Sequence, residues 1–173
     1  MRLLLAFATL LAALFTFVFA APSVSLVGNS LLDTNGIYFV SYDGLVNVNS
    51  FQLSGVLTYG GYQYAAWYTS SRYAIVARRQ LPSGSWTTIQ LPHQLSTNDS
   101  HNVIVIGISP SDGRIHIALD CHSTGMSYLY SEAGLATSGA SWTASRFGSK
   151  LGTLGNLNIG GWVFQFVGLL DGI

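Results

Sequence analysis

The chain has 173 residues and seven basic residues against seven acidic ones, so its formal net charge is zero. This balance argues against a nucleic-acid-binding patch or a membrane-surface patch. Only 8% of the residues are charged while 13% are aromatic, and this shortage of straight-chain helix formers predicts an all-β chain. Because Cys121 is the single cysteine, no intrachain disulfide can form, and the fold must depend on core burial or sheet closure.

Residues 1–20 are expected to form a secretory signal peptide. Arg2 supplies one positive charge, an apolar run follows, and Ala20-Ala21-Pro22 provides the small residues that signal peptidase requires. The alternative is a transmembrane anchor, because ~18 apolar residues just span a bilayer. We expect the mature chain to be secreted and extracellular, and to be long enough for one ordinary domain.

Short strands separated by turn residues are predicted for the N-terminal part of the mature chain, at residues 24–26, 37–42 and 46–51. Three clearer strand-like runs follow at residues 62–69, 72–78 and 85–90. The short connections between these three runs favour antiparallel pairing of neighbours. Residues 91–100 are predicted to form a loop in which His93 is a solvated residue.

Residues 101–122 read H-N-V-I-V-I-G-I-S-P-S-D-G-R-I-H-I-A-L-D-C-H and predict a β-hairpin. Two apolar runs, 103–108 and 115–119, flank a segment rich in turn residues. An antiparallel fold-back brings His101 and His122 to the same end of the hairpin. Two imidazoles at one rim form a candidate site; the alternative is a pair of strand-end histidines that serve only in hydrogen bonding.

An internal repeat supports a more specific fold. Ser85-Trp86-Thr87 recurs as Ser141-Trp142-Thr143, where another strand-like run begins after one at residues 126–130. Four-stranded units that repeat every ~40–50 residues are typical of β-propeller blades. We therefore predict a partial β-propeller of four-stranded antiparallel blades over residues 21–146, with about three blades' worth of chain. A divergent tail rich in Gly and Leu follows at residues 147–173, and a β-sandwich is the alternative fold.

Two longer stretches carry a family resemblance. The run R-Y-A-I-V-A-R-R-Q-L-P-S-G-S-W, followed by N-D-S-H-N and by D-G-R-I-H and D-C-H, resembles the N-terminal part of secreted BNR-repeat, neuraminidase-like proteins. These are seven-bladed β-propellers that include polysaccharide lyases acting on ulvan and on rhamnosyl-glucuronate ends. The resemblance covers about residues 62–142. It implies that the histidines of the His-Asn and Asp-x-His motifs, here His101 and His122, face the sugar, and that a tyrosine and an arginine come from later blades.

The activity that this resemblance implies is cleavage next to a uronic acid by β-elimination. That reaction removes a proton from carbon and gives a proton to the leaving oxygen, and an imidazole with a pKa of ~6.5 can do both. His101 and His122 are thus a base and acid pair, or one base and one carboxylate binder. Asn102, Arg114 and His116 are candidate substrate-binding residues, since amides, guanidinium groups and imidazoles suit a carboxylate. For His116 a structural role is the alternative.

Other residues and functions stay open at this point. Arg72, Arg78 and Arg79 are further candidates for a carboxylate clamp, and the aromatic residues at positions 62, 64, 67 and 68 either pack between blades or stack on sugars. A sialidase-like hydrolase and a truncated glycan-binding or degenerate propeller are the competing functions. The expected partner is an acidic polysaccharide or a glycan containing uronic acid, with no nucleic acid or membrane. No cofactor is required, and a structural cation of the family has no assignable ligands.

Overall fold

The computed structural model describes residues 22–41, 44–47, 55–122, 124–125 and 127–152. The chain divides into two units, Met1–Leu31 and Leu32–Ile173. In the first unit the described residues have no regular secondary structure, so the strand predicted at residues 24–26 is wrong. The predicted signal peptide lies outside the described residues. Within the described part of the chain, no helix has the length and apolar character needed to cross a membrane.

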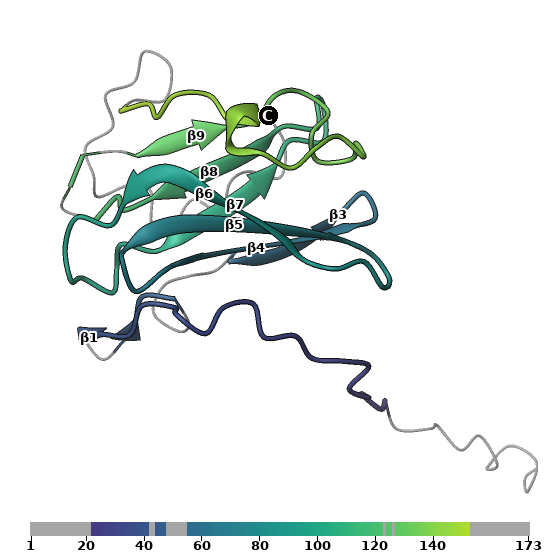
Figure 1. Ribbon diagram of the computed structural model, residues 1–173, viewed down its shortest axis with the longest axis horizontal. Helices are drawn as coiled ribbons and strands as arrows, with labels where there is room; N and C mark the ends of the chain where they lie inside the picture. The colour runs from purple at the N-terminus through teal and green to yellow at the C-terminus, as the bar shows by residue number, and fades with distance from the viewer. Residues whose placement is uncertain (1–21, 42–43, 48–54, 123, 126, 153–173) are drawn as a thin grey trace, which may run out of the picture. The chain divides into compact units, whose positions relative to one another are not determined.

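The second unit is built from antiparallel strands in separate sheets (Figure 1). A two-stranded ribbon pairs β1 (Val40–Ser41) with β2 (Gly44–Leu45). A four-stranded sheet contains β3 (Val56–Tyr59), β4 (Tyr62–Tyr68), β5 (Tyr73–Gln80) and β6 (Thr87–Gln94) in chain order. A three-stranded sheet contains β7 (Ile104–Ile108), β8 (Ile115–Leu119) and β9 (Tyr128–Tyr130). One short 3-10 helix, η1 (Ala144–Arg146), follows.

Strand β6 differs from the prediction because it extends through residues that were expected to form a loop. Along β6 burial alternates, with Ile89, Leu91 and His93 inward and their neighbours exposed. His93 is therefore a buried strand residue and not a solvated one, and the prediction for it is wrong. Pro92 is tolerated here because β6 is an edge strand, where an amide hydrogen is not needed for pairing.

The predicted hairpin of β7 and β8 is confirmed. Its register runs from Ile104 opposite Leu119 to Ile108 opposite Ile115. In the connecting turn Gly113 has a φ of 66°, a conformation that residues with a side chain rarely adopt. Strand β9 pairs with β8 on the other side, so the hairpin lies at the start of a second blade-like sheet.

Beyond β9, the pairing in the three-stranded sheet is irregular. Bridges join Ser131 to Phe147 and Tyr128 to Leu151, so residues 147–151 follow β9 in antiparallel direction. The strand expected to start at Ser141 is absent: that run is irregular and leads into η1. Trp142 is instead a core residue, with its ring 5.7 Å from that of Phe147. The two Ser-Trp-Thr copies therefore occupy different structural positions.

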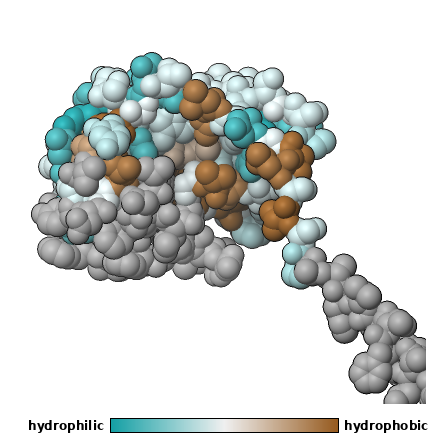
Figure 2. Space-filling model, turned by 90° about the horizontal axis from the view of Figure 1, so that it is seen from below, coloured by the Kyte–Doolittle hydropathy of each residue, from teal (hydrophilic) through white to brown (hydrophobic). Residues whose placement is uncertain are grey.

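The main core lies between the two larger sheets, where β7 contacts β3 and β4. Tyr64, Val76, Ile106 and Ile117 are among its fully buried or nearly fully buried members. Each such side chain contributes roughly 1.5–3 kcal/mol to folding. Some apolar groups stay at the surface among polar ones, as the face in Figure 2 shows. The packing of two antiparallel sheets face to face is what places the hairpin and its histidines.

Candidate active site

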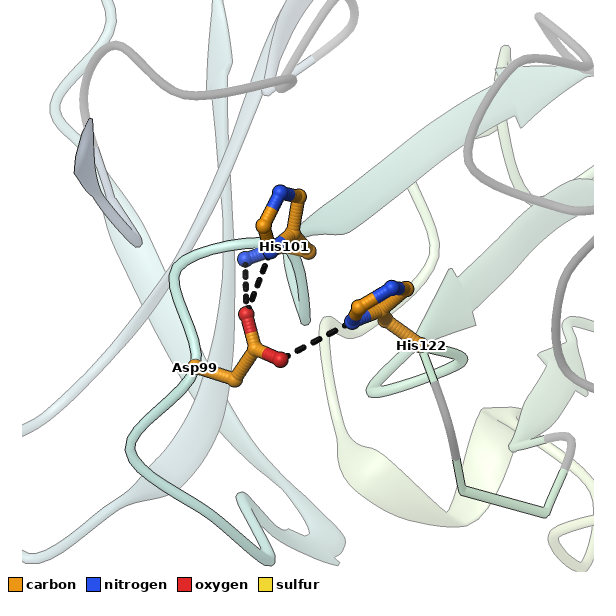
Figure 3. Close-up of side chains that lie close together, drawn as sticks. All are labelled: Asp99, His101 and His122. Carbon is orange, nitrogen blue, oxygen red and sulfur yellow. Dashed lines mark hydrogen bonds and ion pairs between the residues drawn. The ribbon is translucent and has the colours of Figure 1, made fainter. Parts of the chain in front are cut away.

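The structure brings His101 and His122 together, as the hairpin predicts. His101 precedes β7 and His122 follows β8, so both lie at the open end of the hairpin. Their ring centroids are 4.5 Å apart and the ring planes are inclined by 39° (Figure 3). Residues that are distant in the sequence thus form one imidazole pair.

A single carboxylate, that of Asp99, bridges the two rings. Its Oδ1 lies 2.6 Å from Nδ1 of His101, and its Oδ2 lies 2.9 Å from Nδ1 of His122 (Figure 3). Oδ1 also accepts a hydrogen bond from the backbone N–H of His101 at 2.9 Å. Asp99 was not among the predicted site residues. The available signal was its position two residues before His101, since aspartate side chains often accept a backbone N–H two residues on.

The environment of Asp99 favours its ionised form. Burial by itself raises the pKa of this carboxyl. The net effect is nevertheless a lowered pKa, because the carboxylate accepts hydrogen bonds from the backbone and ring of His101 and from the ring of His122, and because it lies near the charge of His122. The side chains of His101, Asp99 and His122 remain 18%, 17% and 16% exposed. The cluster is therefore anionic at its centre and still reachable from solvent.

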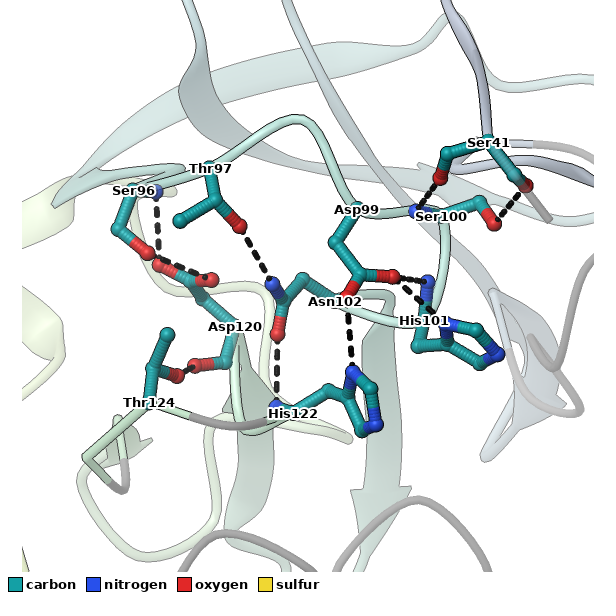
Figure 4. A network of polar contacts seen from close by, with 10 residues as sticks. All are labelled: Ser41, Ser96, Thr97, Asp99, Ser100, His101, Asn102, Asp120, His122 and Thr124. Carbon is teal, nitrogen blue, oxygen red and sulfur yellow. Dashed lines mark hydrogen bonds and ion pairs between the residues drawn. The ribbon is translucent and has the colours of Figure 1, made fainter.

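A buried layer fixes the backbone around the histidines (Figure 4). Asn102 is fully buried; its Oδ1 accepts the backbone N–H of His122 at 2.7 Å and its Nδ2 donates to Oγ1 of Thr97 at 3.1 Å. Ser100 makes two hydrogen bonds of 2.6 Å to Ser41, which tie the loop to β1. Both polar atoms of the buried Asn102 side chain are thus engaged within the protein, where Oδ1 holds the backbone of His122.

Asp120 belongs to a separate network. Its carboxylate accepts hydrogen bonds from the backbone and hydroxyl of Ser96 at 2.9 and 3.1 Å. Nε2 of His93 lies 3.2 Å from Asp120, although without hydrogen-bond geometry. The hydroxyl of Thr124 donates to the backbone carbonyl of Asp120, whose φ is 53°. This network fixes the turn after β8.

Arg114 and His116 are not brought to the histidine pair. Arg114 lies beside the hairpin turn, where it pairs with Asp112 at 2.9 Å and donates to the carbonyl of Ser131 at 2.6 Å. His116 lies in β8, with Nδ1 2.5 Å from the hydroxyl of Tyr128, and burial lowers its pKa. Both side chains are therefore engaged in contacts within the protein that lie away from the histidine pair.

The other candidate arginines and aromatic residues are mostly engaged elsewhere. Arg78 is buried against backbone carbonyls, and Arg79 donates to Gln63 at 2.8 Å and lies over the ring of Trp86. Arg72 donates to Oδ1 of Asn98, in the loop that carries Asp99. The aromatic side chains at positions 64, 67 and 68 are buried, which favours packing over sugar stacking.

Asp99, His101 and His122 are also a possible metal-ligand set. Each offers one ligand atom, all within 4.8 Å of one another, and two imidazoles with a carboxylate suit a zinc-type ion. Both Nδ1 atoms, however, lie at hydrogen-bond distance from the carboxylate. A cation bound through these Nδ1 atoms would replace both hydrogens, whereas the geometry described here is that of a carboxylate-bridged imidazole pair.

Comparison with solved structures defines the class of fold. The chain superimposes on the crystal structure of polysaccharide lyase Uly1 with a TM-score of 0.57 at 23% identity, over 71% of this chain and 35% of that one. The fold is therefore that of an incomplete β-propeller, as the sequence predicts. The sequence model of the BNR repeat-containing family matches residues 62–161, and the chain belongs to this family.

Curated relatives agree with this placement over a shorter stretch. The long isoform of ulvan lyase from Pseudoalteromonas sp. (strain PLSV) is 33% identical over 78 residues, and that from Alteromonas sp. is 32% identical over 78 residues. Each match covers 39% of this chain and 8% of the relative. The chain thus corresponds to a small part of these lyases.

Proposed function

We propose that this chain belongs to a secreted polysaccharide lyase that cleaves an acidic polysaccharide next to a uronic acid. The observation that carries the proposal is the pair of imidazoles, 4.5 Å apart and bridged by Asp99, at a partly exposed end of the hairpin. The ulvan lyases among the relatives support an acidic polysaccharide as the substrate.

The two histidines suit the proton transfers of β-elimination. In this reaction the C5–H and C4–O bonds of the uronic acid break and a C4=C5 double bond forms. One imidazole accepts the proton from C5, and the other, as imidazolium, gives a proton to the leaving glycosidic oxygen. The imidazolium also offers positive charge to the uronate carboxylate, which makes the C5 proton more acidic. His101 and His122 are assigned to these two roles as a pair.

A sialidase-like hydrolase is supported less well. Recognition of a sialic carboxylate needs converging arginines, and the hydrolysis needs a tyrosine nucleophile with a carboxylate partner. Arg78 and Arg79 are held by other contacts, and Arg114 lies beside the hairpin turn, away from the histidines. Non-catalytic glycan binding is the second candidate, and the activity measurement below distinguishes it from cleavage.

Secretion is a separate part of the proposal. The apolar run after Arg2 and the small residues before Pro22 support a signal peptide over residues 1–20. N-terminal sequencing of the protein exported by its host tests this. A mature chain that begins at Ala21 or Pro22 supports secretion, and an intact N-terminus on cell-associated protein contradicts it.

The experiment that tests the function measures the ultraviolet absorbance of unsaturated uronate while the purified chain is incubated with ulvan. We expect the absorbance to rise with the wild-type chain and the rate to fall by roughly 10²–10⁴-fold in His101→Ala and in His122→Ala. His116→Ala is the matched control, because His116 belongs to the same hairpin but contacts Tyr128. A flat trace from folded wild-type chain, or full activity in both histidine variants, would contradict the assignment.

A further inference from the structure

We propose that Asp99 is the positioning residue of this site: one carboxylate fixes the imidazoles of His101 and His122 as Nδ1–H tautomers, so that in each neutral ring the lone pair is on Nε2. The catalytic meaning of this inference rests on the proposed function. The tautomers themselves follow from the geometry alone.

The argument starts from the hydrogens between the carboxylate and the rings. An ionised carboxylate only accepts hydrogen bonds, so each Nδ1 that lies 2.6 or 2.9 Å from it must carry a hydrogen. A neutral imidazole has one N–H, which leaves a lone pair on Nε2. Figure 3 shows that this second nitrogen of each ring points away from Asp99. The same carboxylate thus sets the tautomer and the direction of two rings.

Asp99 can act in this way because its own position is fixed. The backbone N–H of His101 donates to its carboxylate, and the backbone N–H of Asn102 donates to its carbonyl at 3.1 Å. The other ring is fixed through the backbone of His122, which donates to Oδ1 of Asn102. The Asp99 carboxylate and the two imidazoles are therefore held in place before any substrate binds.

The shared carboxylate also determines which protonation state is electrically neutral. With two neutral rings the cluster carries one negative charge, which repels a uronate. With one ring protonated, the cluster is neutral and holds one N–H donor and one Nε2 lone pair, the combination that β-elimination needs. Among the described residues, two charged groups close to this loop in the sequence or the fold have partners of their own, because Arg72 donates to Asn98 and Asp120 faces Ser96 and His93.

The test is a two-bond ¹H–¹⁵N correlation spectrum of the ¹⁵N-histidine-labelled chain, which shows the ring nitrogen that carries the hydrogen. In the wild-type chain we expect His101 and His122 to give the Nδ1–H pattern when neutral. In Asp99→Asn the amide can accept from one ring but donates to the other, so one of the two histidines should change to the Nε2–H pattern. Asp112→Asn, which removes the carboxylate that pairs with Arg114, is the matched control and should leave both unchanged.

A wild-type spectrum with either histidine as the Nε2–H tautomer would overturn the proposal, and so would an Asp99→Asn spectrum with both patterns unchanged. If Asp99→Asn does not fold, the wild-type spectrum alone still decides. Because no substrate is used, this result is independent of whether the chain cleaves ulvan. In an active chain, the wrong tautomer in Asp99→Asn should lower kcat by roughly 10²–10⁴-fold with little change in KM.

Discussion

The side chains of Asp120 and His122 belong to different polar networks although a single residue separates them. Asp120 turns inward, where its carboxylate accepts hydrogen bonds from Ser96, while His122 turns outward to Asp99. The positive φ of Asp120 helps to produce this divergence at the end of β8. The hairpin thus ends in one buried carboxylate that fixes a turn and one partly exposed imidazole that joins the Asp99 cluster.

Replacement of Asp99 by asparagine should make the stability of the chain less sensitive to acid. The pKa of Asp99 is lowered in the folded chain, so its stabilising effect is present above the ordinary value of 3.8 and is lost as the pH falls through the lower folded value. At neutral pH Asp99→Asn should cost about 1.5–3 kcal/mol, as for hydrogen bonds to a charged group. Urea unfolding at several pH values measures this. A difference that persists undiminished well below pH 3.8 would contradict it.

Replacement of Arg78 by lysine should destabilise the fold more than the same change at Arg79. The Arg78 guanidinium donates at 2.7–3.3 Å to three backbone carbonyls between residues 135 and 140 and lies between the rings of Tyr62 and Trp142. A lysine cannot reproduce this fork, and the buried carbonyls would lose partners at a cost of about 2–4 kcal/mol. Arg79→Lys should cost below about 1 kcal/mol. Equal urea midpoints for the two variants would show that the contacts of Arg78 with these carbonyls do not stabilise the fold.

Tyr64 should make the fold sensitive to alkali. Burial is the main cause that raises its pKa to about 12, and its hydroxyl donates to the carbonyl of Ala136 at 2.5 Å. Since the folded value exceeds the ordinary 10.0, this stabilisation is present below pH 10.0 and is lost as the pH rises toward about 12.

Tyr64→Phe should therefore reduce the loss of stability between neutral pH and pH 11, while it costs about 1 kcal/mol at neutral pH. Thermal unfolding followed across this pH range measures both effects. Tyr130→Phe, at an exposed position, is the control and should behave like the wild-type chain. An unchanged alkaline slope in Tyr64→Phe would show that other groups cause the sensitivity.

Gly113, in the turn between β7 and β8, can be compared with Gly61, in the turn between β3 and β4. Both have positive φ values, 66° and 81°, so alanine should cost about 1–2 kcal/mol at either position. A Cβ at Gly113 would lie 3.0 Å from Cα of Gly134, whereas one at Gly61 would meet nothing within 4 Å. We expect Gly113→Ala to give the lower urea midpoint. A Gly61→Ala variant of equal or lower stability would show that the contact with Gly134 is unimportant.

Local patterns in the sequence were sufficient for much of the fold. Alternation and short turns predicted β4, β5, β7 and β8, because strand periodicity and turn chemistry act over a few residues. The end of β6 was missed because residues 91–100 were predicted to form a loop; the strand continues through Pro92 because an edge strand accepts proline. The strand predicted from the second Ser-Trp-Thr copy was wrong because Trp142 is buried in the core between sheets, a position that no local pattern encodes.

For the site, local sequence patterns were enough to place His101 beside His122, because a hairpin with a fixed register brings its two ends together. The other features of the site arise from tertiary packing. This packing brings the Asp99 carboxylate to the Nδ1 atoms of both rings, buries Asn102 against the backbone of His122, and leaves Arg114 and His116 outside the cluster. These outcomes depend on the path of the loop before β7 and on packing between sheets, which combine residues far apart in the chain and so leave no signature in the local sequence.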